Sequence, residues 1–128
     1  MSLRTPLGRV LGLGAAGGGS QHWWMQRVSA LARALLGVWL LASLVLLPDH
    51  GYGTVRAWLG APLHGLLMAL AVLTAAYHSW LGVCVVIEDY VAGEARRVAA
   101  LLAAQFLHLA VGAAALFAVL KVALGSAP

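Results

Sequence analysis

The chain has 128 residues, of which 62% are hydrophobic and only 9% are charged, and its formal net charge is +4. A soluble domain is usually about a quarter charged, so this composition excludes an ordinary soluble enzyme and predicts a membrane protein. The basic residues are scattered between apolar stretches, which argues against nucleic-acid binding. The single cysteine, Cys84, cannot form a disulfide within the chain and is expected to be a small buried hydrophobe.

Residues 1–20 contain glycine and arginine and are expected to form a cytoplasmic N-terminal arm. Within it, residues 12–17 match the spacing of a dinucleotide-binding fingerprint. That fingerprint requires a preceding strand and a following helix within a parallel sheet, and no such pattern surrounds it. We therefore expect the match to be due to chance. The rest of the chain, residues 21–128, is expected to form a membrane anchor.

Three apolar stretches predict transmembrane helices over about residues 23–47, 62–88 and 96–122. Each exceeds the roughly 20 residues that a helix needs to cross a bilayer. A turn-forming cluster at 48–53 ends the first helix, and Pro62 suits the first turn of the second. The predicted fold class is an all-α membrane protein with three transmembrane helices.

The orientation follows from the distribution of lysine and arginine. Three crossings place the N-terminal arm and the 88–97 connection on one side, which carries Arg4, Arg9, Arg27, Arg96 and Arg97. The opposite side carries only Arg56 and Lys121. The positive-inside rule therefore predicts a cytoplasmic N-terminus and an external C-terminus.

His78 is the main candidate for a functional residue within the membrane. It precedes Tyr90 by 12 residues, a distance of about 18 Å along a helix, which predicts a position near the bilayer centre. Imidazole is a common axial ligand of haem iron, and helix bundles hold cofactors between facing helices. A neutral histidine can also simply hydrogen-bond a neighbouring helix, so the residues alone leave both roles open.

Two other histidines widen the alternatives. His108 follows Arg96 by 12 residues on an antiparallel helix, so it should lie at the depth of His78, and one chain could then ligate a haem by itself. His64 precedes His78 by 14 residues on nearly the same face, a spacing that would also suit two stacked haems. Both ideas rank below a single haem that is shared with another subunit.

Asp89 and Tyr90 lie where the second predicted span meets water. Asp89 shares the face of His78 within roughly 20° and lies about 16 Å further along the helix axis. The simpler interpretation is a helix-ending acid beside an interfacial aromatic residue. The functional interpretation is a phenol that donates to a quinone carbonyl, with a carboxylate that relays protons. The residues by themselves favour the simpler one.

The second predicted helix contains His78, Trp80, Gly82, Asp89 and Tyr90 in the pattern H-x-W-x-G-x(6)-D-Y. This pattern resembles the second helix of the small hydrophobic membrane-anchor subunit of succinate dehydrogenase. The start of the first helix, Arg27-x-Ser29-Ala30, is similar to the family's R-[AST]-[ST]-A start, and residues 4–8 and 22–26 resemble the alphaproteobacterial branch. The length and the three-helix layout agree over essentially the whole chain.

The resemblance implies roles for individual residues. His78 would be one axial ligand of haem b, and the larger cytochrome b-type anchor subunit would supply the other. Tyr90 would hydrogen-bond a ubiquinone carbonyl with Asp89 beside it, and Arg27 would lie near a haem propionate or the quinone pocket. His64 and His108 fall outside the motif and are assigned only to the vicinity of the haem.

The resemblance also implies a multi-pass protein of the bacterial cytoplasmic (inner) membrane that is not catalytic alone. It would pack with the larger anchor subunit into a haem-binding bundle, and it would receive electrons from succinate through flavoprotein and iron–sulfur subunits on the cytoplasmic side. Haem number and trimerisation of the complex stay open. Two alternatives are a di-haem cytochrome b of another quinone oxidoreductase, which would depend on His64 or His108, and a haem-free membrane anchor.

Overall fold

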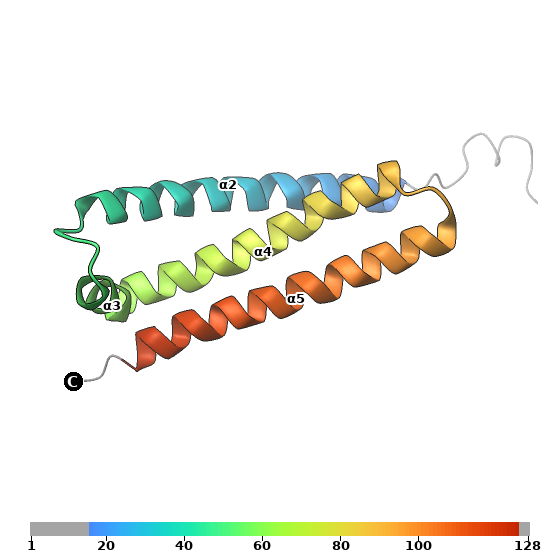
Figure 1. The fold of residues 1–128 in the computed structure, drawn as a ribbon. Helices are drawn as coiled ribbons and strands as arrows, with labels where there is room; N and C mark the ends of the chain where they lie inside the picture. Colours follow the sequence, from blue (N-terminus) through green and yellow to red (C-terminus); the bar gives the residue numbers. More distant parts are fainter. Residues whose placement is uncertain (1–15, 126–128) are drawn as a thin grey trace, which may run out of the picture.

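The computed structural model describes residues 16–125, apart from the side chains of residues 16–19 and of His22. Within this range the chain forms helices α2 (Ala16–Leu46), α3 (Tyr52–Gly60), α4 (Pro62–Tyr90) and α5 (Glu94–Leu124), shown in Figure 1. The segments Trp23–Leu46, Pro62–Tyr90 and Glu94–Leu124 are each long and apolar enough to cross a membrane. The predicted all-α fold with three membrane-spanning helices is therefore confirmed.

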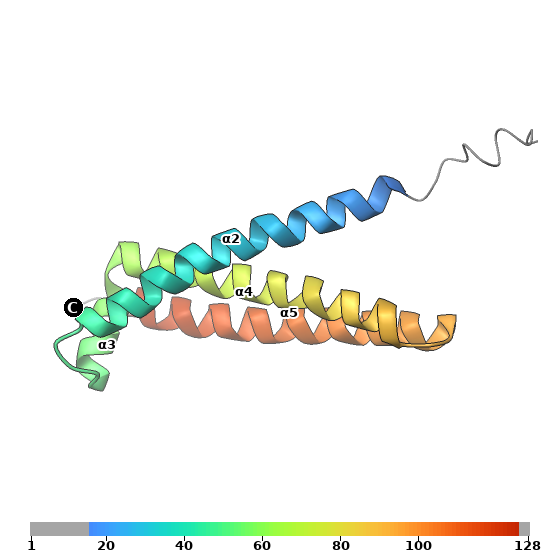
Figure 2. The same ribbon diagram turned by 90° about the horizontal axis from the view of Figure 1, so that it is seen from above.

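The three long helices run side by side, with α4 between α2 and α5 (Figure 1). The contact between α4 and α5 is the most extensive in the described chain, and α2 packs chiefly on α4. Figure 2 shows that the N-terminal part of α2 diverges from the other two helices. The molecule therefore consists of a close α4–α5 hairpin with α2 leaning on its α4 side.

Small residues explain the close approach of α4 and α5. A Cβ added to Gly112 would lie 3.1 Å from the Cβ of Ala76, and one added to Gly65 would lie 3.0 Å from the Cβ of Ala123. Small side chains at such crossings let two backbones approach in lipid. The turn between the helices contains Gly93 at φ +86°, a conformation that glycine adopts without steric strain.

The short helix α3 was not predicted, because its first residues fall in the turn-forming cluster at 48–53. Asp49 supports its start: one carboxylate oxygen accepts from the Gly51 N–H at 2.7 Å, and the other accepts from the Thr54 hydroxyl at 2.9 Å. The Gly51 N–H, and after it the Thr54 hydroxyl, hold the pKa of Asp49 below its usual value. Gly51 and Gly53 are typical of turns, and for this reason the sequence pattern did not predict the helix.

The ends of the long helices differ by a few residues from the predicted ones. The predicted start of α4 at Pro62 is confirmed, and this helix continues to Tyr90. Helix α2 begins at Ala16, so residues 16–20 of the predicted arm are helical. Extending an existing helix is far easier than nucleating a new one, so the helix of the first span continues into this glycine-rich segment. Residues 1–15, including most of the fingerprint match, lie outside the described residues.

Few side chains of the described chain are buried. The buried hydrophobic residues are Leu81, Cys84 and Ala104, which confirms the prediction for the cysteine. Large apolar side chains are exposed along all three spans, from Leu31 on α2 to Phe117 on α5. Outside a membrane such surfaces would favour association, whereas in a bilayer they face lipid or other helices.

Candidate functional site

His78 lies in the middle of α4 and is turned toward α2. Its Nδ1 is 3.0 Å from the Oγ of Ser29, a residue that precedes it by 49 positions in the chain. The imidazole is half-buried, whereas Ser29 is the one buried polar residue of the described chain, at 7% exposure. The hydrogen bond therefore fixes the histidine ring at a protected contact between two helices.

The second partner of Ser29 identifies the protonated nitrogen of His78. The Oγ of Ser29 also lies 3.0 Å from the backbone carbonyl of Gln26. A hydroxyl has one proton, and the carbonyl can only accept, so the Ser29 O–H donates to Gln26. In the contact with His78 the hydroxyl oxygen must then accept from Nδ1–H. In a neutral imidazole Nε2 is then the nitrogen without a proton, and it has no hydrogen-bond partner among the described residues.

His108 has the opposite arrangement. Its Nδ1 is 2.7 Å from the Ala104 carbonyl, and its Nε2 is 3.2 Å from the Oγ of Ser79. Because the carbonyl only accepts, Nδ1 carries the proton and Nε2 accepts from the Ser79 hydroxyl. Both ring nitrogens are thus engaged. Since Ser79 adjoins His78 on α4, the predicted similar depth of the two histidines is confirmed, but the two rings meet different neighbours.

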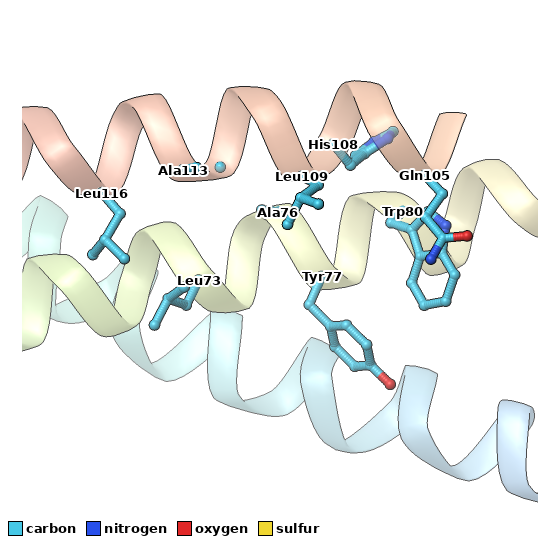
Figure 3. Close-up of a pocket in the computed structure, with 10 residues that line it drawn as sticks. Leu73, Ala76, Tyr77, Trp80, Gln105, His108, Leu109, Ala113 and Leu116 are labelled. Atoms are coloured by element: carbon cyan, nitrogen blue, oxygen red, sulfur yellow. The ribbon is translucent and has the colours of Figure 1, made fainter. Parts of the chain in front are cut away.

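The α4–α5 hairpin carries a groove of about 360 Å³ next to His108. Figure 3 shows Tyr77, Trp80 and Gln105 projecting to one side of the two helices along it. Apart from these residues and His108, its lining is aliphatic or glycine. The Nε1 of Trp80 is buried and has no hydrogen-bond partner within the described chain. His78 does not line this groove, so the structure separates the two histidine environments.

Asp89 and Tyr90 are exposed at the last residues of α4, and Tyr90 is 83% exposed. Neither side chain makes a hydrogen bond or ion pair within the described part of the chain. Arg27 on α2 is exposed too, with its guanidinium carbon 4.6 Å from the centre of the Trp23 ring. The N-terminal part of α2 lies at the same end of the bundle as the end of α4 (Figure 1).

His64 lies at the other end of the bundle, within an aromatic cluster. Its ring stacks on Trp58 of α3 with centroids 5.1 Å apart, and it lies 6.1 Å from the ring of Trp39 on α2. Its Nδ1 contacts the Trp58 carbonyl at 3.1 Å, which gives it the role of linking α3 to α4. His50, in the loop after α2, contacts the Leu44 carbonyl in the last turn of that helix, and the side chain of His22 lies outside the described residues.

The sequence did not indicate a role for Ser29, although it lies in the Arg27-x-Ser29-Ala30 motif. It also did not indicate the Trp39–Trp58 contact, with ring centroids 5.8 Å apart, that joins α2 to α3. Both depend on which residues of distant segments face each other. The available signal for Ser29 was its place among other polar residues on one face of the first helix, with Gln26 three residues before it and Arg33 four residues after it.

The comparisons with known proteins agree with a chain of membrane-spanning helices. The model of the succinate dehydrogenase/fumarate reductase transmembrane subunit family matches residues 1–121. The chain belongs to this family. Family membership and the three apolar helices make it a multi-pass protein of the bacterial inner membrane. No solved structure shows a significant match to it.

Curated members of the anchor family resemble the chain over most of its length. The succinate dehydrogenase hydrophobic membrane anchor subunit of Paracoccus denitrificans is 32% identical over 122 residues, which is 95% of this chain and 94% of that protein. The corresponding subunit of Rickettsia bellii is 33% identical over 88 residues, covering 69% of this chain and 70% of its own. That of Rickettsia conorii is 35% identical over 79 residues, covering 61% and 63%. The predicted resemblance is confirmed.

Proposed function

We propose that this chain is the membrane-anchor subunit of a succinate:ubiquinone oxidoreductase, in which His78 supplies one axial ligand of a single haem b. The observation that carries the proposal is the state of the His78 ring. Its Nδ1–H is held by Ser29, and its Nε2 is unprotonated and unpartnered among the described residues. Histidine ligands of metals commonly have this arrangement, with the non-ligating nitrogen donating to a fixed acceptor.

The surroundings of His78 suit a porphyrin. The ring lies on an apolar helix, one turn from Gly82, where an added Cβ would meet no atom within 4 Å. The bound haem would supply a one-electron couple between ferric and ferrous iron. The residues of this chain would hold the group, orient its ligand and exclude water. The second ligand would come from the larger cytochrome b-type anchor subunit, because both ring nitrogens of His108 are engaged and His64 is stacked on Trp58 at the other end of the bundle.

The exposed end of α4 is proposed as this chain's part of the quinone site. The Tyr90 phenol would donate a hydrogen bond to a carbonyl oxygen of ubiquinone, where negative charge develops on reduction. Asp89 would lie beside it and relay protons, and Arg27 would face the haem propionate or the quinone pocket. Reduction of ubiquinone to ubiquinol consumes two electrons and two protons, so a carboxylate and a phenol at the water-facing rim suit this chemistry.

The proposed assembly follows from the exposed surfaces and the charge distribution. The apolar faces of the spans would pack with the larger anchor subunit into one bundle. The N-terminus and the Asp89–Tyr90 end would face the cytoplasm, where the iron–sulfur and flavoprotein subunits would dock and deliver electrons from succinate. This chain would then have no catalytic residue for succinate oxidation itself, and a trimer of the complex remains compatible with it.

The test is a reduced-minus-oxidised visible spectrum with haem quantitation on the purified complex, with the native chain and with His78→Ala. We expect one haem b per native complex and none in the variant, with the soluble subunits still bound. A native complex without haem that retains its soluble partners would favour a haem-free anchor. Two haems that depend on His64 or His108 would favour a di-haem cytochrome b. Full haem content in His78→Ala would overturn the ligand assignment.

A further inference from the structure

The hydrogen bond between Ser29 and His78 joins two helices at a position that the proposed ligand role does not by itself require. Ser29 is 7% exposed, so water does not compete for its hydroxyl. In a medium of low polarity a hydrogen bond is stronger and an unmatched polar group is more costly. The contact is also specific in direction, because the Ser29 proton is already donated to the Gln26 carbonyl.

We propose that Ser29 is a positioning residue that determines which nitrogen of His78 is free to bind iron and tunes the electron density of the bound ring. This inference rests on the proposed haem ligation. The serine oxygen can only accept from His78, so it favours the tautomer with the proton on Nδ1. The same bond restrains rotation of the ring about its side-chain torsions and directs Nε2 away from α2.

The bond has an electronic consequence in addition to the geometric one. An acceptor on Nδ1–H makes the opposite nitrogen a more basic ligand. A more basic axial ligand stabilises ferric iron more than ferrous iron, which lowers the midpoint potential of the haem. Removing the serine hydroxyl should therefore weaken haem binding and raise the midpoint potential.

The chain contains a matched control for this effect. Ser79 contacts His108 at 3.2 Å, close to the 3.0 Å between Ser29 and His78, and it lies at the same depth of the bundle. In that pair, however, the serine donates and the histidine accepts. The substitution Ser79→Ala therefore tests the general consequence of losing one hydrogen bond between two membrane-spanning helices.

The experiment compares complexes that contain Ser29→Ala, Ser29→Cys or Ser79→Ala with the native and His78→Ala complexes. Three quantities are measured on each assembled complex: the haem per complex, the midpoint potential by redox titration, and the axial-ligand signals by electron paramagnetic resonance. Sulfur is larger than oxygen and a weaker acceptor, so Ser29→Cys keeps a group that can accept from His78 and forms an intermediate step between serine and alanine. None of these readouts depends on catalytic turnover.

For Ser29→Ala we expect a lower haem affinity, by about 10- to 100-fold, as for other residues that orient metal ligands. The preference for ferric over ferrous iron should fall by up to about tenfold, which for one electron corresponds to a rise of about 59 mV in midpoint potential. Ser29→Cys should lie between native and Ser29→Ala, the paramagnetic signals of both should shift, and Ser79→Ala should match the native complex.

Equal potentials and unchanged paramagnetic signals in the native, Ser29→Cys and Ser29→Ala complexes would overturn the inference, as would an equal shift in Ser79→Ala. If Ser29→Ala retains no haem, the potential of Ser29→Cys decides in the same way. Retention of haem in His78→Ala would instead overturn the proposed ligation. Loss of haem in His78→Ala with native behaviour of the Ser29 variants would reject the role of Ser29 alone.

Discussion

The two faces of α4 present a pair of serine–histidine contacts that differ in the direction of the hydrogen bond and in the burial of the serine, which is buried at Ser29 and exposed at Ser79. Toward α2, Ser29 accepts a hydrogen bond from His78 and leaves Nε2 without a partner in the described chain. Toward α5, Ser79 donates to Nε2 of His108, whose Nδ1 is occupied by a helix carbonyl. The residue types and the depth are the same, yet only one ring retains a nitrogen that could bind a metal.

Within this pair, the direction of the serine hydrogen bond decides whether Nε2 is free, and this distinguishes His78 from His108 as a candidate ligand. An intrahelical carbonyl fixed the tautomer in both cases. In one it acts directly, because the Ala104 carbonyl binds the His108 ring. In the other it acts through a serine, because the Gln26 carbonyl orients the Ser29 hydroxyl. A depth argument alone would have treated the two histidines as equivalent.

The largest expected effect is a contrast between His78→Ala and His108→Ala in the same complex. Loss of an axial ligand should abolish haem binding, whereas loss of the His108 ring removes a helix-to-helix bond worth roughly 0.6 kcal/mol within a membrane. Haem quantitation per complex makes the comparison. A complete loss of haem in an assembled His108→Ala complex would contradict the expected contrast between the two histidines. It would favour a haem that is held between both histidines of one chain.

The next largest effect concerns the exposed end of α4. Tyr90→Phe should lower ubiquinone reduction by about tenfold to a hundredfold, because the variant lacks a donor where charge and protons arrive. Succinate oxidation with an artificial electron acceptor should be unchanged. Tyr77→Phe, in the α4–α5 groove, is the matched control and should retain both activities. Unchanged ubiquinone turnover in Tyr90→Phe would remove the phenol from the proposed site.

A steric change between α4 and α5 can test whether the two faces of α4 are independent. Gly112→Val places a side chain against Ala76, where even a Cβ would be 3.1 Å away, and overpacking of this kind costs about 1–3 kcal/mol. Thermal unfolding of the complex should shift to lower temperature. Gly37→Ala, which meets no atom within 4 Å, should not show this shift. If the faces are independent, the haem spectrum of assembled Gly112→Val will be native.

The smallest effect is expected at Asp49, beside the start of α3 and away from the two serine–histidine contacts of α4. The pKa of Asp49 lies below the ordinary 3.8 in the folded chain, chiefly because of the Gly51 N–H and then the Thr54 hydroxyl. A carboxylate with a depressed pKa stabilises the fold fully above its unfolded value, and this contribution is lost as the pH falls through the folded pKa. The small decrease in Tm caused by Asp49→Ala should therefore be constant at neutral and mildly acidic pH.

Below pH 3.8 the difference in Tm between native and Asp49→Ala complexes should shrink, because the native carboxyl becomes protonated. A pH series of thermal unfolding curves measures it. Thr54→Val removes one of the two bonds and should give part of the decrease. A difference that grows toward low pH would contradict the assigned role of the carboxylate, and the haem spectrum should not change in either variant.

The elements that the sequence predicted correctly depend on local composition. The three spans follow from apolar stretches of sufficient length, and the start of α4 follows from Pro62, whose ring suits a first helical turn. Helix α3 escaped prediction because Gly51 and Gly53 resemble a turn. Its start depends on a carboxylate outside the helix, and its side chain Trp58 packs between Trp39 and His64 of other helices.

The candidate site also has properties that follow from the sequence and others that depend on tertiary contacts. The sequence by itself determined that His78 and His108 lie at one depth, because equal spacing along antiparallel helices gives equal rise. Only the tertiary structure decided which ring has a free nitrogen. That property depends on the rotation and register of α2 against α4, which bring together Ser29 and His78 across 49 residues. Composition and periodicity describe one helix at a time and contain no information about the facing residue of another.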